Sequence, residues 1–186
     1  MASVPDLAFR RLERSDFELL QQWLSAPHVS YWWGGPRDLA GVEEEFGPCV
    51  DGADPTLVFV VTISEGAIPV GIVQSYMLRD TPGYEAAVGV PKAAGMDLLI
   101  GEPRWIGVGL GKEVIARFVT EIGWSAFPQA KRYMAGPSVR NIRSRRAFER
   151  AGFVYKGLAD VPDEPDPEAV MVLERPSTTE LAAQIG

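Results

Sequence analysis

The segment RWIGVGLGKEVI, residues 104–115, carries glycines at positions 107, 109 and 111 between an apolar stretch and a helical pattern. Glycine allows the backbone to approach a ligand closely, and the free N–H groups at the start of a helix attract anions. The segment lacks the spacer of a P-loop, and its third glycine comes too early for a dinucleotide-binding fingerprint. It therefore predicts a phosphate-binding turn of a different kind.

A single carboxylate interrupts the otherwise apolar segment GMDLLIG, residues 95–101. This residue, Asp97, would carry a charge into a buried strand, which costs free energy unless the charge has a partner or a function. A carboxylate at such a position can accept a proton or bind a cationic substrate. It can also cap a strand end or form an ion pair there, and the sequence leaves both interpretations open.

The composition excludes several classes of site. His28 and Cys49 are the only histidine and the only cysteine, which leaves almost no material for a Ser-His-Asp site, a zinc site or a disulfide. The formal net charge of −7 disfavours nucleic acid and favours cationic ligands, although an acidic surface also serves solubility alone. We therefore expect no metal and no nucleic-acid partner.

No segment of the sequence reads as a targeting or membrane element. No apolar run reaches the ~18 residues of a membrane span. The first residues, MASVPDLAFRRLERSD, lack the apolar core of a signal peptide. We therefore expect a cytoplasmic protein without a membrane partner.

The order of predicted elements indicates one α/β domain, residues 1–186, in which helices flank a mixed sheet. Hydrophobic periodicity predicts helices over residues 15–24, 38–50, 112–127 and 139–153. Runs of apolar and β-branched residues predict strands over residues 7–12, 56–63, 69–78, 96–101, 131–136, 154–158 and 169–175. Residues 79–95 are expected to form a loop, and residues 176–186 a loosely held tail.

Two further motifs carry a family resemblance. Arg104, Gly107 and Gly109 satisfy the pattern Arg/Gln-x-x-Gly-x-Gly/Ala, and Asn141 opens the segment NIRSRRAFERAGF, with an aromatic residue and a closing AGF. Together they resemble the signatures of the GCN5-related N-acetyltransferase (GNAT) superfamily. The resemblance implies acetyl-CoA as co-substrate and the GNAT fold, a mostly antiparallel sheet flanked by helices and splayed at the fourth and fifth strands.

A finer resemblance spans residues 7–175. The segments YWWGGP, GIVQSYM, GMD and GVGLGKEVI are similar to those of the aminoglycoside 6′-N-acetyltransferases, enzymes of antibiotic resistance that acetylate a cationic amine by direct transfer. The resemblance implies that Asp97 is catalytic, because it deprotonates or orients the amine. It also implies a substrate site lined by Trp32, Trp33, Gln74, Tyr76 and Asp97. To these we add Tyr84 and Glu85 from the segment 79–95 and Asp163 from the acidic loop 159–168, whose acids could supply further contacts to a cationic substrate.

The same resemblance implies a set of cofactor-binding residues. Backbone N–H groups of Leu98, Leu99 and Ile100 would polarise the thioester carbonyl. The remaining residues of the set are Arg104, Gly107, Val108, Gly109, Gly111, Lys112, Asn141 and Phe148. The role of Asn141 stays open between a bond to the pantetheine arm and capping of its helix.

The sequence departs from the family pattern at two positions. The family commonly has a tyrosine at the position of Phe148, which protonates the leaving thiolate; here water or the substrate ammonium would supply that proton. Related enzymes carry an aspartate before the Pro-Ser pair, where this chain has Gly136. One anionic contact to a substrate amine is therefore absent from its usual position, which bears on the identity of the substrate.

Two other functions compete with this interpretation. A siderophore-type acyltransferase acting on N-hydroxylysine shares the fold and the tryptophan loop, but such relatives pair an aspartate with a histidine on the third or fourth strand, and the only histidine here is His28. An acyl-CoA-binding module would bind acetyl-CoA without turnover. In each case the sequence is compatible with a monomer or a homodimer.

Overall fold

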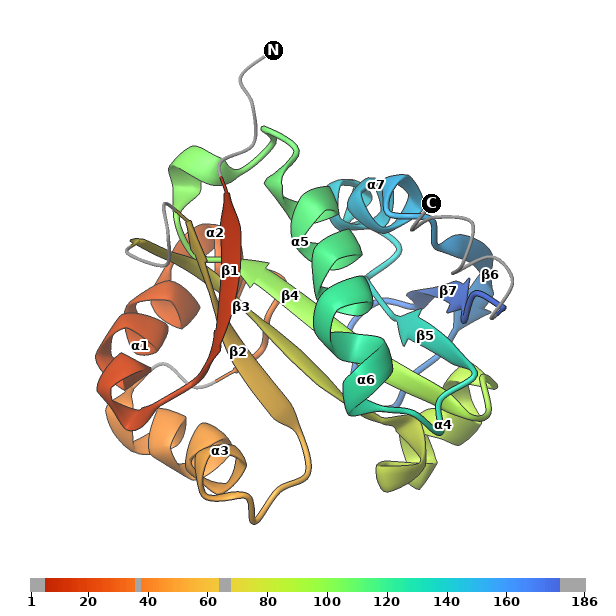
Figure 1. The fold of residues 1–186 in the computed structure, drawn as a ribbon, viewed down its shortest axis with the longest axis horizontal. Helices are drawn as coiled ribbons and strands as arrows, with labels where there is room; N and C mark the ends of the chain where they lie inside the picture. Colours follow the sequence, from red (N-terminus) through yellow and green to blue (C-terminus); the bar gives the residue numbers. More distant parts are fainter. Residues whose placement is uncertain (1–5, 36–37, 64–67, 178–186) are drawn as a thin grey trace.

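The computed structural model describes residues 6–35, 38–63 and 68–177, so most of the expected tail lies outside the described residues. Helices lie on both faces of a single sheet (Figure 1). Its strands are β1 (Leu7–Arg11), β2 (Leu57–Ile63), β3 (Ile68–Met77), β4 (Ala93–Ile100), β5 (Arg132–Ala135), β6 (Val154–Ala159) and β7 (Glu168–Glu174).

The sheet order is β1-β2-β3-β4-β5-β7-β6, and every neighbouring pair is antiparallel except β4 and β5. The parallel pair is short: it runs only from Ala93↔Arg132 to Gly95↔Met134. Beyond Gly95, β4 continues to Ile100 beside β3 alone. The expected splay between the fourth and fifth strands is therefore confirmed, and it opens one edge of β4.

Alternation along the strands divides the core between the two faces of the sheet. Ile72 and Leu99 pack with helices α1 (Phe17–Ser25) and α3 (Leu39–Asp51). Their neighbour Val73, on the opposite face, packs with α5 (Leu110–Phe118). The α5 helix and the one-turn helix α6 (Trp124–Ala126) follow one another across that face (Figure 1).

The remaining elements are short, apart from α7. They are α2 (Pro27–Ser30), α4 (Pro82–Val88), α7 (Ile142–Arg150), the 3₁₀ turns Arg14–Asp16, Leu78–Asp80 and Pro103–Trp105, and a π turn at Val119–Gly123. The prediction of a loop over residues 79–95 was wrong. This segment forms α4 and the start of β4, because Pro82 pre-sets the first helical turn and Gly89, with φ of 66°, ends the helix in the left-handed conformation.

None of the helices within the described residues is long and apolar enough to cross a membrane. The predicted fold class, a mixed and mostly antiparallel sheet flanked by helices, is confirmed. The arrangement leaves the splayed edge of β4 as the place where ligands can reach the middle of the sheet.

The pairing of β3 with β4 depends on the absence of a side chain at Gly71. A Cβ at this position would overlap the backbone carbonyl of Leu99 and lie 3.1 Å from the Ile100 Cα. We expect Gly71→Ala to lower the free energy of unfolding by about 1–3 kcal/mol, measured by urea denaturation, because backbone has to shift to make room. Gly34→Ala is the matched control, since nothing lies within 4 Å of a Cβ there. Equal stability of the two variants would contradict this explanation.

Candidate active site

Two cavities meet at the splayed edge of β4. The larger, which we call the acidic cavity, has a volume of about 880 Å³, and the smaller, the basic cavity, about 560 Å³. Both are lined by the same set of residues where they join: Tyr31, Trp32, Trp33, Leu98, Asn141, Ser144 and Phe148. A ligand in one cavity can therefore contact a ligand in the other at this junction.

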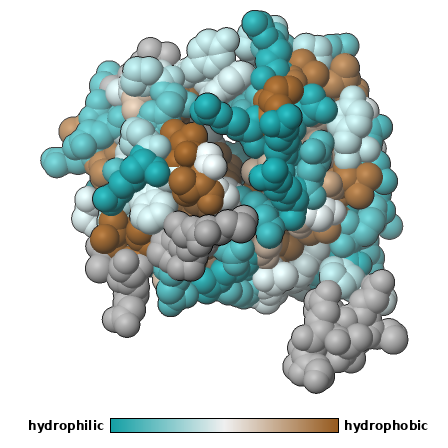
Figure 2. Space-filling view, turned by 90° about the horizontal axis from the view of Figure 1, so that it is seen from above, coloured by the Kyte–Doolittle hydropathy of each residue, from teal (hydrophilic) through white to brown (hydrophobic). Residues whose placement is uncertain are grey.

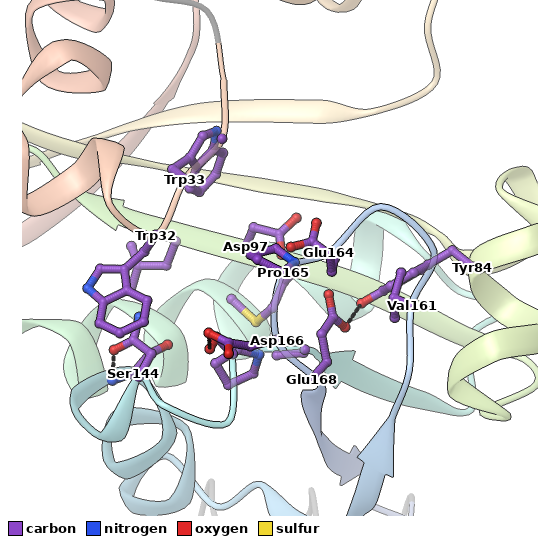
Figure 3. Close-up of a pocket in the computed structure, with 18 of the residues that line it drawn as sticks. Trp32, Trp33, Tyr84, Asp97, Ser144, Val161, Glu164, Pro165, Asp166 and Glu168 are labelled. Carbon is purple, nitrogen blue, oxygen red and sulfur yellow. Dashed lines mark hydrogen bonds between the residues drawn. The ribbon is translucent and has the colours of Figure 1, made fainter.

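The acidic cavity gathers carboxylates from separate elements. Asp97 comes from β4, Glu164 and Asp166 from the loop before β7, and Glu168 from the first residue of β7. Figure 3 shows Asp97, Glu164 and Glu168 directed into one space, with Trp33 above it and Trp32 beside Ser144. The one arginine of this lining, Arg140, is already paired with Asp166 at 3.5 Å. The cavity therefore has the charge and the aromatic walls to hold a cationic molecule.

Asp97 is held by its neighbours on β3. It lies opposite Gln74 in the antiparallel register, and the Gln74 side-chain amide donates a hydrogen bond of 2.9 Å to its Oδ2. Burial raises the pKa of Asp97, hydrogen bonds from Gln74 and Tyr76 partly offset this, and the nearby Glu164 raises it further. A carboxylate with a raised pKa is a better proton acceptor than an exposed aspartate.

Tyr76 reaches Asp97 because its cross-strand partner is a glycine. Gly95 lies opposite Tyr76, and a Cβ at Gly95 would fall 2.6 Å from the Tyr76 ring. The ring therefore lies flat over the backbone of β4. Burial and the nearby carboxylates of Asp97 and Glu168 raise the pKa of Tyr76 well above its ordinary value, so its hydroxyl remains a donor.

Glu168 is held from the other side of the cavity. The hydroxyl of Tyr84, on α4, donates a hydrogen bond of 2.7 Å to its Oε2 (Figure 3). Burial raises the pKa of Glu168 to about 7; the Tyr84 hydrogen bond opposes the rise, and the charges of Asp97 and Glu164 add to it. Glu168 is therefore a carboxylate of the acidic cavity that titrates close to neutrality.

The basic cavity lies between the start of α5 and the side of α7. Gly107 and Gly109 adopt φ values of 81° and 95°, a left-handed conformation that disfavours side chains. Their turn leads into α5, whose first N–H groups have no helical acceptor. The cations of the lining are Lys112, Arg143, Arg146 and Arg150. The surface is hollowed at the end of the molecule seen in Figure 2, with hydrophobic and hydrophilic side chains on different sides of the opening.

This lining fits a molecule that combines phosphates with an apolar arm. The positive-φ turn and the helix start provide N–H groups, and the arginines provide charge. Leu98, Leu99 and Ile100 provide apolar contact along β4. Between Met96 and Ile100 the described residues offer β4 no second strand, so alternate N–H groups of this segment remain available to a ligand.

The structure brings most of the predicted residues to these cavities. The acidic cavity is lined by Trp32, Trp33, Gln74, Tyr76, Tyr84 and Asp97, and the basic cavity by Leu98, Leu99, Ile100, Gly107, Gly109, Gly111, Lys112, Asn141 and Phe148. Asn141 also caps α7, because its Oδ1 accepts a hydrogen bond of 3.1 Å from the Ser144 N–H. Its capping role is therefore present in the structure.

Four predicted residues lie outside the cavity linings. Glu85 follows Tyr84 on α4, and because successive helical residues point in different directions, only Tyr84 faces the acidic cavity. Asp163 is exposed with φ of 68°, and its neighbours Glu164 and Asp166 line the acidic cavity instead.

Two predicted cofactor-binding residues lie outside the lining of the basic cavity. The Arg104 guanidinium stacks on the neighbouring Trp105, with its central carbon 5.7 Å from the centre of the ring. Val108 is 53% exposed.

The sequence interpretation missed two groups of lining residues. Arg143, Arg146 and Arg150 lie on one face of α7, and their helical spacing was a readable signal. Glu168 was hidden in an acidic, proline-rich loop pattern and gave no signal of its own.

The single histidine has a structural position. The Nε2 atom of His28 lies 3.2 Å from the carbonyl oxygen of Ile100 and 3.1 Å from that of Gly101, so Nε2–H donates to the backbone at the end of β4. Within the described residues, no group of three or more His, Cys, Asp or Glu side chains is arranged to hold a metal ion.

The raised pKa of Glu168 has a consequence for stability. Because its native pKa of about 7 exceeds the value expected in the unfolded chain, the native state holds an extra proton between the two. The contribution of Glu168 to the free energy of unfolding is therefore largest at acid pH and falls as the pH rises through 7. Urea denaturation of the wild type and of Glu168→Gln at about pH 5 and about pH 8 measures this contribution, because the variant has no titratable group at position 168. The wild type should lose stability relative to the variant on raising the pH; a constant difference would contradict the pKa shift.

The chain matches known acetyltransferases over most of its length. The family model described as acetyltransferase (GNAT) domain matches residues 13–161. The aminoglycoside N(6′)-acetyltransferase type 1 of Klebsiella pneumoniae is 29% identical over 163 residues, which cover 86% of this chain and 79% of that protein.

Solved structures agree with the sequence matches. AAC(6′)-Ib in complex with paromomycin and acetyl-CoA superposes with a TM-score of 0.80 at 30% identity, over 91% of this chain and 94% of that one. The same enzyme in complex with coenzyme A and kanamycin superposes with a TM-score of 0.81 at 27% identity, over 97% and 100%. The chain therefore belongs to the GNAT family of acetyltransferases.

Proposed function

We propose that this chain acetylates the 6′-amine of aminoglycosides, with acetyl-CoA as the acetyl donor. The observation that carries the proposal is the junction of a basic and an acidic cavity at the splayed edge of β4, beside Asp97. The names of the relatives support the choice of substrate, since both the curated protein and the superposed structures are aminoglycoside acetyltransferases.

The basic cavity would hold acetyl-CoA, which supplies the acetyl group as a thioester. The turn of Gly107 and Gly109 and the start of α5 would donate N–H groups to the pyrophosphate. The cations of α7 would neutralise phosphate charge. Unpaired N–H groups between Met96 and Ile100 would polarise the thioester carbonyl and stabilise the negative charge that develops on its oxygen.

Asp97 would bind the substrate ammonium and deprotonate it. An aminoglycoside amine is mostly protonated at neutral pH, and only the free amine attacks a carbonyl carbon. Asp97 first attracts the ammonium and then accepts one proton from it, a transfer that its raised pKa makes less unfavourable. Gln74 and Tyr76 fix the orientation of the carboxylate throughout.

One more proton must reach the sulfur when the C–S bond breaks. Phe148 lines the junction but has no proton to donate. Tyr31 and Ser144 line both cavities and carry hydroxyl groups that could pass a proton from solvent or from the substrate ammonium. We propose that this route protonates the leaving thiolate in place of the tyrosine that the family commonly has at the position of Phe148.

Both cavities are lined by residues of one chain, so a monomer or a homodimer would suffice for activity. An enzyme that uses acetyl-CoA would act in the cytoplasm, where this thioester is supplied. A histidine-dependent acylation of N-hydroxylysine has less support, because His28 is bonded to the backbone after β4.

The function is tested by CoA release from the purified chain with acetyl-CoA and kanamycin, a 6′-amino compound, and with a 6′-hydroxyl aminoglycoside. We expect turnover on the former only. Asp97→Asn should lower kcat/KM by about 10²–10³-fold, because the base is removed while its shape is kept. Asp163→Asn is the matched control and should leave the rate unchanged, since Asp163 lies outside the cavity lining. Tight acetyl-CoA binding without turnover on either compound would instead indicate a binding module.

The assignment of the basic cavity gives a second test. Arg146→Ala should raise the KM for acetyl-CoA about tenfold and leave the KM for kanamycin unchanged, because one charge-assisted contact to phosphate is lost. Lys131→Ala removes an exposed cation that lines neither cavity. If Arg146→Ala and Lys131→Ala gave the same KM for acetyl-CoA, the phosphates would have to bind elsewhere.

A further inference from the structure

Glu168 occupies space that a side chain at position 136 would otherwise fill. A Cβ built on Gly136 would overlap the Glu168 carboxylate and lie 2.6 Å from the Tyr84 hydroxyl. The carboxylate therefore lies directly over the backbone of Gly136, at the wall of the acidic cavity. An acid from β7 takes the place that a side chain following β5 would have.

Backbone hydrogen bonds fix this arrangement. The Val139 N–H donates to the Pro167 carbonyl and the Ala169 N–H to the Pro137 carbonyl, each at 2.8 Å. These bonds join the segment after β5 to the start of β7 on both sides of Glu168. Tyr84 holds the carboxylate from α4. Its position is therefore set by the fold and by a side-chain contact, rather than by a free rotamer.

The charge of Glu168 is not neutralised within the described residues. Its hydrogen-bond partner Tyr84 is neutral, and the ion pairs of the described chain do not include it. The charged groups that act on it, Asp97 on β4 and Glu164 in the loop before β7, are both acids. The electrostatic attraction between Glu168 and a cation that enters the cavity would therefore be stronger than the attraction of an exposed carboxylate.

We propose that Glu168 binds a second ammonium group of the aminoglycoside, distinct from the amine that Asp97 prepares for acetylation. Glu168 is then a specificity-determining residue that selects substrates with a further amine on the side of the cavity formed by α4 and β7. This inference rests on the proposed function and names one contact within it. Gly136 is required for the contact because any side chain there would displace the carboxylate.

The test is steady-state kinetics of the full chain with kanamycin at about pH 8, where Glu168 is ionised. Glu168→Gln keeps the shape and the acceptor for Tyr84 but removes the charge. We expect the KM for kanamycin to rise about tenfold, with kcat and the KM for acetyl-CoA within about twofold of wild type. Asp163→Asn is the matched control at an exposed acid of the same loop region outside the cavity lining, and it should leave the KM for kanamycin unchanged.

A second variant moves the acid from β7 to the segment that follows β5. The double variant Gly136→Asp with Glu168→Ala should recover most of the lost affinity for kanamycin, because the carboxylate is returned to the same space. An unchanged KM in Glu168→Gln, or a fall in kcat at constant KM, would overturn the subsite while leaving the proposed function standing. Absence of turnover by the wild type on kanamycin and on every other 6′-amino aminoglycoside would overturn both.

Discussion

The short pairing of β4 with β5 is the constraint on which the site depends. Two parallel strands that stay together for only three residue pairs leave the rest of β4 with one neighbour. The polar backbone of that free edge would be costly to bury without partners. A ligand that enters the gap can satisfy these groups, which explains why both cavities meet there and why Asp97 and Leu98 lie at their boundary.

Charge is divided between the two sides of this gap in a chain that is acidic as a whole. The cations of α7 face the basic cavity, whereas the acids of β4, β7 and the preceding loop face the acidic cavity. The division fits a reaction between an anionic donor and a cationic acceptor, because each reactant is attracted to its own side. Tryptophans from the segment after α2 line the junction of the two cavities.

Local sequence signals predicted the parts of the site that depend on local structure. The glycine turn and the lone acid of an apolar strand were readable because each breaks the pattern of its own segment. The helix α4 was missed because its seven residues give little periodicity, and only Pro82 and Gly89 mark its ends. The Tyr84–Glu168 hydrogen bond joins residues 84 positions apart, and no local pattern encodes such a pairing. The space above Gly136 likewise exists only once β7 lies beside β5.

In the proposed reaction, donor and acceptor meet at the splayed edge of β4. A crystal structure of this chain with coenzyme A and kanamycin would show whether they bind there. We expect the pyrophosphate against Gly107 and Gly109, the thiol end of coenzyme A beside Leu98, and the 6′-amine of kanamycin within hydrogen-bond distance of Asp97. Coenzyme A bound away from the basic cavity, or kanamycin presenting a different amine to Asp97, would contradict it.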